Sequence, residues 1–178
     1  MKKVLLAFLF SFIAVQAYAD TGPYIEGNLG YSYITNTVTD GIPTQDSQNF
    51  GFNLSTGVMF FNFGADLGYS QYGAPIYEGK LTQETAYLNG IHLAFKTKQS
   101  IGPLFIVGKL GYGWLNEGGF EIGNVSVPSR SGGGLYWAFG TGVQFNPNVY
   151  AQVTYEQNQG DNGIPNANMA MIGMGYTF

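Results

Sequence analysis

The sequence of 178 residues predicts an all-β fold, an eight-stranded antiparallel up-and-down transmembrane β-barrel. Apolar residues alternate with period two over eight segments, which is the spacing typical of β-strands. In each segment the large apolar residues share one face, whereas glycine and small polar residues occupy the other. Short turns and long polar loops alternate between the segments. A membrane barrel turns its apolar face outward to lipid, whereas a soluble barrel hides that face inside.

The first nineteen residues are predicted to form a signal peptide. Two lysines precede an apolar run of 12 residues at 4–15, and the small residues Ala17 and Ala19 follow it. That run is too short to cross a hydrocarbon core of roughly 30 Å as a helix. We expect cleavage after Ala19, which leaves residues 20–178 as the barrel domain of an exported protein. The alternative is an N-terminal helix that is retained in the fold.

Eight strands are predicted, each about the 9 to 11 residues that a tilted membrane strand needs. They are residues 24–35, 49–60, 63–72, 85–98, 104–115, 134–145, 149–157 and 167–178. Short turns are expected at 61–62, 99–103 and 146–148, and long loops at 36–48, 73–84, 116–133 and 158–166. The two kinds of connection alternate, which is typical of an outer-membrane barrel with periplasmic turns and extracellular loops. An even number of strands places both chain termini at the turn end.

The division into two faces recurs from the first strand to the last. The apolar faces of the first, second, sixth and eighth strands hold Ile25, Leu29, Tyr31, Tyr33; Phe50, Phe52, Leu54, Val58, Phe60; Leu135, Trp137, Phe139, Val143, Phe145; and Ile172, Met174, Tyr176, Phe178. Burial gains roughly 25 cal/mol per Å² of apolar area, and the opposite faces offer little bulk to bury. We therefore expect the large residues to face lipid.

Aromatic residues gather at both ends of the predicted strands, as in the two aromatic girdles of membrane barrels. Those expected toward the loops are Tyr31, Tyr33, Tyr69, Tyr112, Trp114 and Trp137, and those toward the turns are Phe60, Phe63, Phe145, Tyr176 and Phe178. Asn89 interrupts the apolar face of the fourth strand beside Tyr87 and Ile91. We expect Asn89 to lie near the lipid headgroups.

Composition excludes several classes of function. The chain has no cysteine and a single histidine, His92, so it can form neither a disulfide nor a metal centre with two histidines. Seven basic and eleven acidic residues give a net charge of −4, the wrong sign for a protein that neutralises nucleic-acid phosphates. We expect no cofactor and no nucleic-acid partner.

The chain resembles the small outer-membrane β-barrel family, meaning the OmpA transmembrane domain and OmpX/Ail-like proteins. The resemblance rests on the signal peptide, the eight alternating strands and the C-terminal pattern, and it spans essentially all of residues 22–178. It implies that the terminal residues form an assembly signal for the barrel-insertion machinery: Ile172, Met174, Tyr176 and Phe178. Length and acidic loops are also similar to accessory colonisation factor A. Because the sequence stops at Phe178, we expect no peptidoglycan-binding domain.

Six ionisable residues are expected on the inward face: Glu26, Asp66, His92, Lys96, Lys109 and Glu156. Charges inside a narrow barrel are tolerated only when paired or hydrated, so an interior salt-bridge network is predicted. If the hairpin around 99–103 is symmetric about 100–101, His92 faces Lys109 across it, and Lys109 pairs with Asp66 or Glu156.

Two alternatives remain open from the sequence. One is a narrow ion-conducting, porin-like barrel, although eight strands leave an interior that side chains fill. The other is a lipid A-modifying outer-membrane enzyme, for which His92 is the only candidate catalytic residue. We expect no catalysis, because His92 lies in the middle of a strand with no serine beside it to serve as a nucleophile.

The four long loops are acidic. Their charged residues are seven carboxylates and two cations: Asp40, Asp46, Glu78, Glu84, Glu117, Glu121 and Asp161 against Lys80 and Arg130. Loops on a rigid scaffold are where such proteins place function. We therefore predict a structural or surface-interaction role, in adhesion or colonisation, in the outer membrane of a Gram-negative bacterium. The expected partners are outer-membrane lipid and lipopolysaccharide, the insertion machinery, and host surface or matrix proteins.

Overall fold

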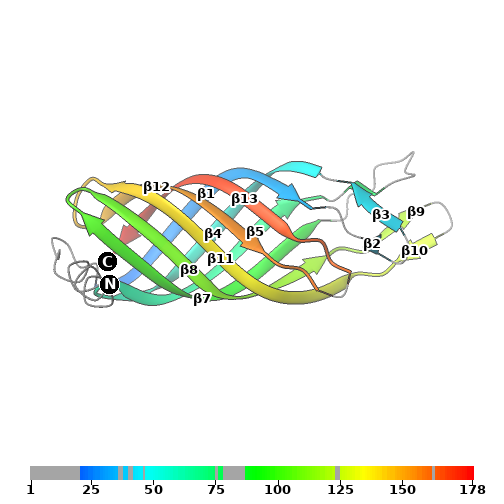
Figure 1. Ribbon diagram of the computed structural model, residues 1–178, viewed down its shortest axis with the longest axis horizontal. Coiled ribbons are helices and arrows are strands. Elements are labelled where there is room, and N and C mark those ends of the chain that lie inside the picture. The colour runs from blue at the N-terminus through cyan, green and yellow to red at the C-terminus, as the bar shows by residue number, and fades with distance from the viewer. Residues whose placement is uncertain are drawn as a thin grey trace, which may run out of the picture.

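The protein is a closed antiparallel barrel of eight strands with small sheets beyond one end (Figure 1). This computed structural model describes residues 21–35, 38–39, 42–45, 47–74, 76–77, 87–122, 125–161 and 163–178. The barrel strands are β1 (Gly22–Ile34), β4 (Ser47–Phe60), β5 (Phe63–Gly73), β7 (Leu88–Ile101), β8 (Leu104–Glu117), β11 (Arg130–Gln144), β12 (Val149–Asn158) and β13 (Ala167–Thr177). They pair in chain order, and β13 closes the ring on β1. The predicted fold class is confirmed.

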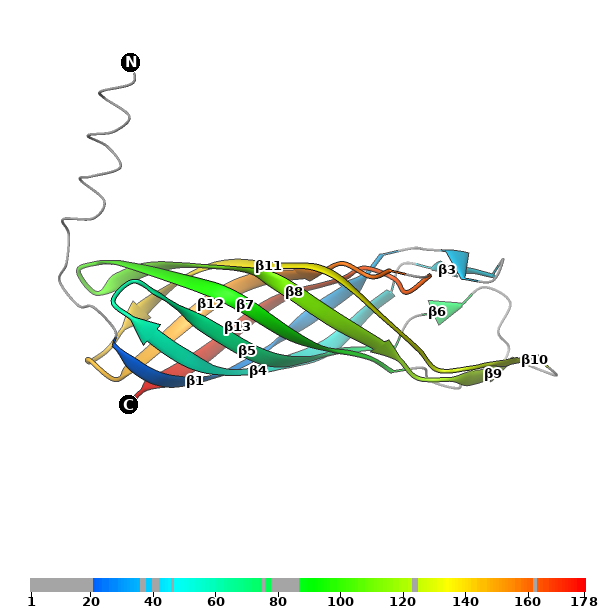
Figure 2. The same cartoon turned by 90° about the horizontal axis from the view of Figure 1, so that it is seen from below.

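Short strands lie beyond the loop end of the barrel (Figure 2). The loop after β8 forms a two-stranded sheet of β9 (Phe120–Ile122) and β10 (Val125–Val127). The loops after β1 and β5 share a sheet of β2 (Val38–Thr39), β3 (Ile42–Gln45) and β6 (Ile76–Tyr77). The loop end is therefore extended by strand pairing, whereas the other end carries short turns. The predicted signal peptide lies outside the described residues.

The register fixes how the barrel closes. One circuit around the barrel can be followed from partner to partner, from Val58 of β4 back to Gln48 of the same strand. The residues passed on the way are Ala65, Phe95, Leu110, Trp137, Gln157, Asn168 and Tyr33. One circuit thus shifts the register from position 58 to position 48, by ten residues. Such a stagger requires tilted strands, which in barrels of this kind lean by roughly 35–45°.

The outward face is apolar, as predicted. Leu29 is 55% exposed, Phe139 59% and Ile172 67%, values that only a lipid environment makes favourable for side chains of this size. Every charged residue of the eight barrel strands lies on the inward face, at Glu26, Asp66, Lys96, Lys98, Lys109, Glu117, Arg130 and Glu156. The described residues contain no helix long and apolar enough to cross a bilayer.

The inward face is bulkier than the sequence pattern suggested. The largest fully buried side chains include four tyrosines, Tyr24, Tyr72, Tyr136 and Tyr150, together with Phe105 and Met169. Glycines on neighbouring strands make room for them. At Gly175 a Cβ atom would lie 2.2 Å from Cζ of Tyr150, so only glycine accommodates that ring. The expectation of an interior with little bulk is therefore wrong.

Candidate functional site

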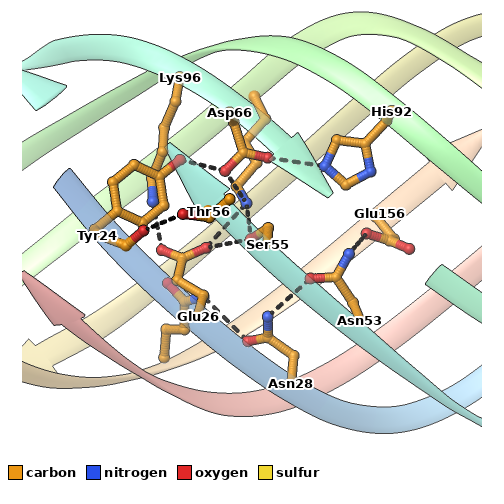
Figure 3. A network of polar contacts seen from close by, with 12 residues as sticks. Tyr24, Glu26, Asn28, Asn53, Ser55, Thr56, Asp66, His92, Lys96 and Glu156 are labelled. Carbon is orange, nitrogen blue, oxygen red and sulfur yellow. Dashed lines mark hydrogen bonds and ion pairs between the residues drawn. The ribbon is translucent and has the colours of Figure 1, made fainter. Parts of the chain in front are cut away.

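The barrel interior holds a cluster of ionised side chains from four strands: Glu26 of β1, Asp66 of β5, Lys96 of β7 and Lys109 of β8. Figure 3 shows Glu26, Asp66 and Lys96 pointing toward one another. Lys109 Nζ lies 2.9 Å from Glu26 Oε2 and 2.8 Å from Asp66 Oδ1. Lys96 pairs with the other oxygen of Glu26. Two carboxylates and two ammonium groups thus form one continuous chain of ion pairs.

Hydroxyl groups complete this cluster. The Tyr150 hydroxyl donates to Glu26 Oε1 at 2.7 Å, and the Ser55 hydroxyl donates to Glu26 Oε2 at 3.1 Å. The Tyr24 hydroxyl donates to Asp66, and the Lys96 ammonium lies 3.7 Å from the centre of the Tyr24 ring. Buried ions are tolerated when their remaining lone pairs and protons are satisfied, and this arrangement meets that condition.

His92 lies beside the cluster on β7. Its Nε2 is 2.8 Å from Asp66 Oδ2, and its ring stacks on Tyr136 with centroids 3.8 Å apart. A Cβ on Gly68 would lie 2.3 Å from the imidazole Cε1, so glycine provides the space for the ring. The expectation that His92 faces Lys109 is wrong, because His92 pairs with Gly113 of β8. Lys109 pairs with Lys96 instead.

This correction has a simple physical cause. Ile101 pairs with Leu104, so the hairpin turns at Gly102 and Pro103, two residues later than expected. Gly102 has φ of +62°, a conformation that glycine adopts without steric cost. A shift of the turn centre by two residues moves every cross-strand partner by four. Two lysines therefore lie opposite each other, and Glu26 bridges them.

Glu156 lies apart from this cluster, on the inward face of β12. It accepts hydrogen bonds from Ser70 at 2.8 Å, from the Tyr136 hydroxyl at 3.0 Å and from Asn53 at 3.5 Å. Across the described residues its partners are these neutral groups, and it forms no ion pair there. Asn53 also accepts from Asn28, which links Glu156 to the amides of β1. The six predicted residues thus face one interior but form a cluster of five and a separate carboxylate.

An apolar cluster closes the barrel at its loop end. Its buried members are Ile34, Tyr72, Leu88, Leu115, Ile164, Ala167, Met169 and Met171. Ile164 comes from the loop between β12 and β13, whereas the others belong to barrel strands. We call this group the apolar plug. Its signal in the sequence was a pair of adjacent large apolar residues at strand ends, as at Trp114 and Leu115, because such a pair must place one member inside.

The candidate catalytic residue, His92, lies buried inside the barrel. His92 is 1% exposed, and Asp66, Tyr136 and Gly68 surround its ring. Among the described residues, Nε2 of this ring is hydrogen-bonded to Asp66, and Nδ1 has no hydrogen-bond partner. The described residues also contain no group of three or more His, Cys, Asp or Glu that could hold a metal ion.

The predicted assembly-signal residues all point outward on the last strand. Ile172, Met174, Tyr176 and Phe178 are exposed, and the rings of Tyr176 and Phe178 meet edge to face at 5.0 Å. The Phe178 amide donates to the Pro23 carbonyl at 2.9 Å, which extends the closing pair of strands to the last residue. Their role as an assembly signal remains a prediction.

Two charged residues assigned to the long loops lie in barrel strands. Glu117 is the last residue of β8, Arg130 is the first residue of β11, and the two are cross-strand partners. Glu117 is 2% exposed, so its carboxylate does not belong to the acidic outer surface. Of the other charged loop residues, Asp40, Asp46, Glu78, Lys80 and Glu84 lie outside the described residues, and Asp161 is exposed.

The outer membrane protein beta-barrel domain family matches residues 4–178 of the chain. No curated protein matches it in sequence. Among solved structures, Neisserial surface protein A (NspA) is 14% identical with a TM-score of 0.64, covering 89% of this chain and 98% of that one. The N-terminal barrel of Pseudomonas aeruginosa OprF is 13% identical with a TM-score of 0.61, covering 89% and 98%.

Yersinia pestis Ail, solved in complex with the heparin analogue sucrose octasulfate, is 21% identical with a TM-score of 0.56. The match covers 88% of this chain and 99% of Ail. At these identities the likeness shows a shared fold.

Proposed function

Because the chain belongs to the outer membrane protein beta-barrel domain family, we propose that this outer-membrane barrel is a closed scaffold that acts through its extracellular loops. Its role is adhesion to, or colonisation of, surfaces outside the cell. The signal peptide at 1–19, the insertion machinery as a partner and the C-terminal signal belong to the same proposal, because each is needed to deliver such a barrel to the outer membrane.

One observation carries the proposal: the interior is filled, whereas the loop end is extended. The ion-pair cluster and the apolar plug occupy the barrel at successive levels. Beyond the plug, three loops continue into the small sheets β9–β10 and β2–β3–β6. Strand pairing gives these loops shape, and a rigid scaffold with shaped loops is a typical arrangement for binding surfaces.

The loop proposal is tested with bacteria that display the barrel. One variant lacks residues 118–128, which include β9 and β10, and another lacks residues 37–46; each deletion is closed by two glycines. The intact barrel is expected to bind epithelial cells or immobilised matrix proteins, and the deletions are expected to reduce binding at least fivefold. A matched control deletes nothing but replaces Leu110 on the lipid face by Val. Equal binding by the intact and deleted barrels would leave a structural envelope protein.

The charge of the loops indicates which surfaces fit. Sucrose octasulfate, the heparin analogue bound in the Ail structure, is strongly anionic. The charged residues of the predicted loops are mainly carboxylates, which repel an anionic ligand. We therefore propose a partner that is neutral or basic, and we expect heparin to compete poorly for binding.

A narrow ion pore is the second candidate, and the continuous polar interior is the observation that favours it. Ion pairs, hydrogen bonds and the stacked rings of His92 and Tyr136 connect Tyr150 near the turns to Glu156 farther along the barrel. The apolar plug opposes conduction, because an ion would lose its hydration there. Single-channel recordings in planar bilayers decide between the two, and steady conductance by the unaltered barrel would favour the pore.

A lipid A-modifying activity has less support, because His92 is sealed inside the barrel. Mass spectrometry of lipid A from cells with the native chain and with His92→Ala tests it directly. We expect identical spectra, and a modification lost with His92 would overturn a non-catalytic role.

A further inference from the structure

We propose that three amide side chains on the outer surface, Gln71, Asn89 and Asn116, bind the sugar headgroup of a glycolipid in the outer leaflet. We call these three residues the amide ladder. The proposal uses the location of the barrel in the outer membrane and is independent of what the loops bind.

Register places the three amides side by side. Gln71 of β5 pairs with Asn89 of β7, and Asn89 pairs with Asn116 of β8. Directly opposed residues on neighbouring strands have Cβ atoms about 4.5–5.5 Å apart. The ladder therefore crosses three strands, and Ser131 of β11, the partner of Asn116, extends it by a hydroxyl.

The ladder lies where headgroups lie. All three residues point outward near the loop ends of their strands, and the next outward row toward the membrane centre is Tyr69, Ile91 and Trp114. Tyr and Trp at this position mark the boundary of the hydrocarbon region. The ladder thus lies directly on the loop side of this aromatic row, with the exposed ring of Tyr87 beyond it toward the loops.

The hydrogen-bonding capacity of the ladder is unused within the described structure. The side chains of Gln71, Asn89 and Asn116 make no hydrogen bond there. Two other outward amides provide a contrast, because Gln157 accepts from the Trp137 indole at 2.8 Å and Asn168 accepts from the Tyr155 hydroxyl at 3.1 Å. Each amide offers two donors and one acceptor oxygen, so the ladder presents nine hydrogen-bonding sites to its surroundings.

The chemistry of these groups favours sugar over phosphate. A sugar hydroxyl both donates and accepts, as an amide does, whereas a phosphate is bound best by lysine or arginine. The outward face of the eight barrel strands carries no charged residue. Tyr112 and Trp114 meet edge to face at 4.8 Å beside the ladder and add aromatic faces against which a sugar ring can pack.

The test uses fluorescence of Trp114, which adjoins the ladder. Trp137, the second of the two tryptophans, is replaced by Phe, and the folded full chain is placed in vesicles of brominated phosphatidylcholine, which quenches the reporter. Four lipids without bromine are then added in separate series. They are plain phosphatidylcholine, a neutral galactosyl diacylglycerol, phosphatidic acid and lipopolysaccharide.

We expect galactosyl diacylglycerol and lipopolysaccharide to displace the quencher at least three times better than phosphatidylcholine, and phosphatidic acid to do no better than phosphatidylcholine. The triple variant Q71L/N89L/N116L is expected to lose the preference. The variant Gln48→Leu, which removes an outward amide of β4 outside the ladder, is expected to keep it. In a Trp114→Phe chain, Trp137 is the sole reporter. There the glycolipids are expected to displace the quencher about as well as phosphatidylcholine does.

Several results would overturn the proposal. Phosphatidic acid matching the galactolipid would assign the site to phosphate, and a triple variant with an unchanged preference would place the binding elsewhere. If the triple variant does not fold, Asn116→Leu alone is measured, and a preference reduced by less than half would count against the ladder. Loss of loop-dependent adhesion leaves this result untouched.

Discussion

The imidazole of His92 lies flat against the phenol ring of Tyr136, with ring centroids 3.8 Å apart and planes inclined by 6°. His92 belongs to β7 and Tyr136 to β11, two strands separated by β8, so the stack links next-nearest strands inside the barrel. Each ring is also tied to a different carboxylate, His92 to Asp66 and Tyr136 to Glu156. The stack therefore joins the ion-pair cluster to the separate carboxylate.

Substitutions at Tyr136 separate the contribution of its hydrogen bond to Glu156 from that of its stack on His92. Tyr136→Phe keeps the stack but removes a donor from Glu156, and we expect the free energy of unfolding to fall by about 1–3 kcal/mol. Tyr136→Leu also removes the stack, and a further loss of about 0.5–1.5 kcal/mol is expected. Denaturant unfolding of the reconstituted barrel measures both. Tyr155→Phe, which removes an outward hydroxyl, serves as control, and equal losses at both tyrosines would contradict this role of Tyr136.

Lys109 holds two carboxylates at once, so its loss is expected to be costly. Lys109→Met leaves Glu26 paired with Lys96 but deprives Asp66 of its ammonium partner, and the free energy of unfolding is expected to fall by about 3–5 kcal/mol. The double variant Lys109→Met with Asp66→Asn removes one charge of each sign and is expected to regain part of the loss. Asp66→Asn is also measured alone. The prediction fails if Asp66→Asn lowers the free energy of unfolding as much in the Lys109→Met chain as it does in the native chain.

Gly68→Ala tests the space occupied by the histidine ring. The added Cβ would lie 2.3 Å from His92 Cε1, and overpacking of this kind costs about 1–3 kcal/mol. Gly27→Ala is the matched control, because its nearest atom, Leu54 Cδ2, lies 3.6 Å away. Combining Gly68→Ala with His92→Ala should remove the clash. The midpoint of thermal unfolding is measured for the native chain and these three variants. A Gly68→Ala chain as stable as the Gly27→Ala chain would refute the argument.

The turn between β4 and β5 holds a residue in an unfavourable backbone conformation. Phe61 has φ of +58°, which for a residue other than glycine costs roughly 1–2 kcal/mol. Phe61→Gly is therefore expected to raise the free energy of unfolding by about 1 kcal/mol, whereas Phe61→Leu, which keeps a Cβ, should leave it nearly unchanged. The urea concentration at the midpoint of unfolding is measured for both variants. A glycine variant less stable than the leucine variant would show that contacts of the Phe61 ring outweigh the backbone strain.

The apolar plug is expected to control conduction. The unaltered barrel should be electrically silent in planar bilayers, and the double variant Leu88→Ala with Leu115→Ala should admit water and show small steady currents. Leu110→Ala on the lipid face is the control. Silent recordings from the double variant would indicate that the ion-pair cluster alone blocks the interior.

The sequence was sufficient to predict the apolar face that turns to lipid, because alternation follows directly from strand geometry. That Asn89 lies near the headgroups stays a prediction, and the register gives this residue two amide neighbours, Gln71 and Asn116. Pairing across strands was harder to predict, since a shift of the 99–103 turn by two residues exchanged His92 for Lys96 as the partner of Lys109.

The inward tyrosines were missed for a different reason. Tyr24 and Tyr150 sit on a face otherwise read as glycine and small polar groups, and a ring can lie there only because glycines on other strands leave room, as Gly175 does for Tyr150. Such complementarity joins residues far apart in the chain. Single-strand patterns contain no record of it.

The shift of ten residues on closing the ring ties all eight pairings together. If one hairpin slipped by two residues, the total would become eight or twelve unless another interface slipped the opposite way. A different total changes the strand tilt and the circumference, so every inward side chain would meet new neighbours. A register slip at one interface thus affects the closure of the whole barrel. The pairing of β1 with β13 therefore keeps its register only when the slips at the other seven interfaces add up to zero.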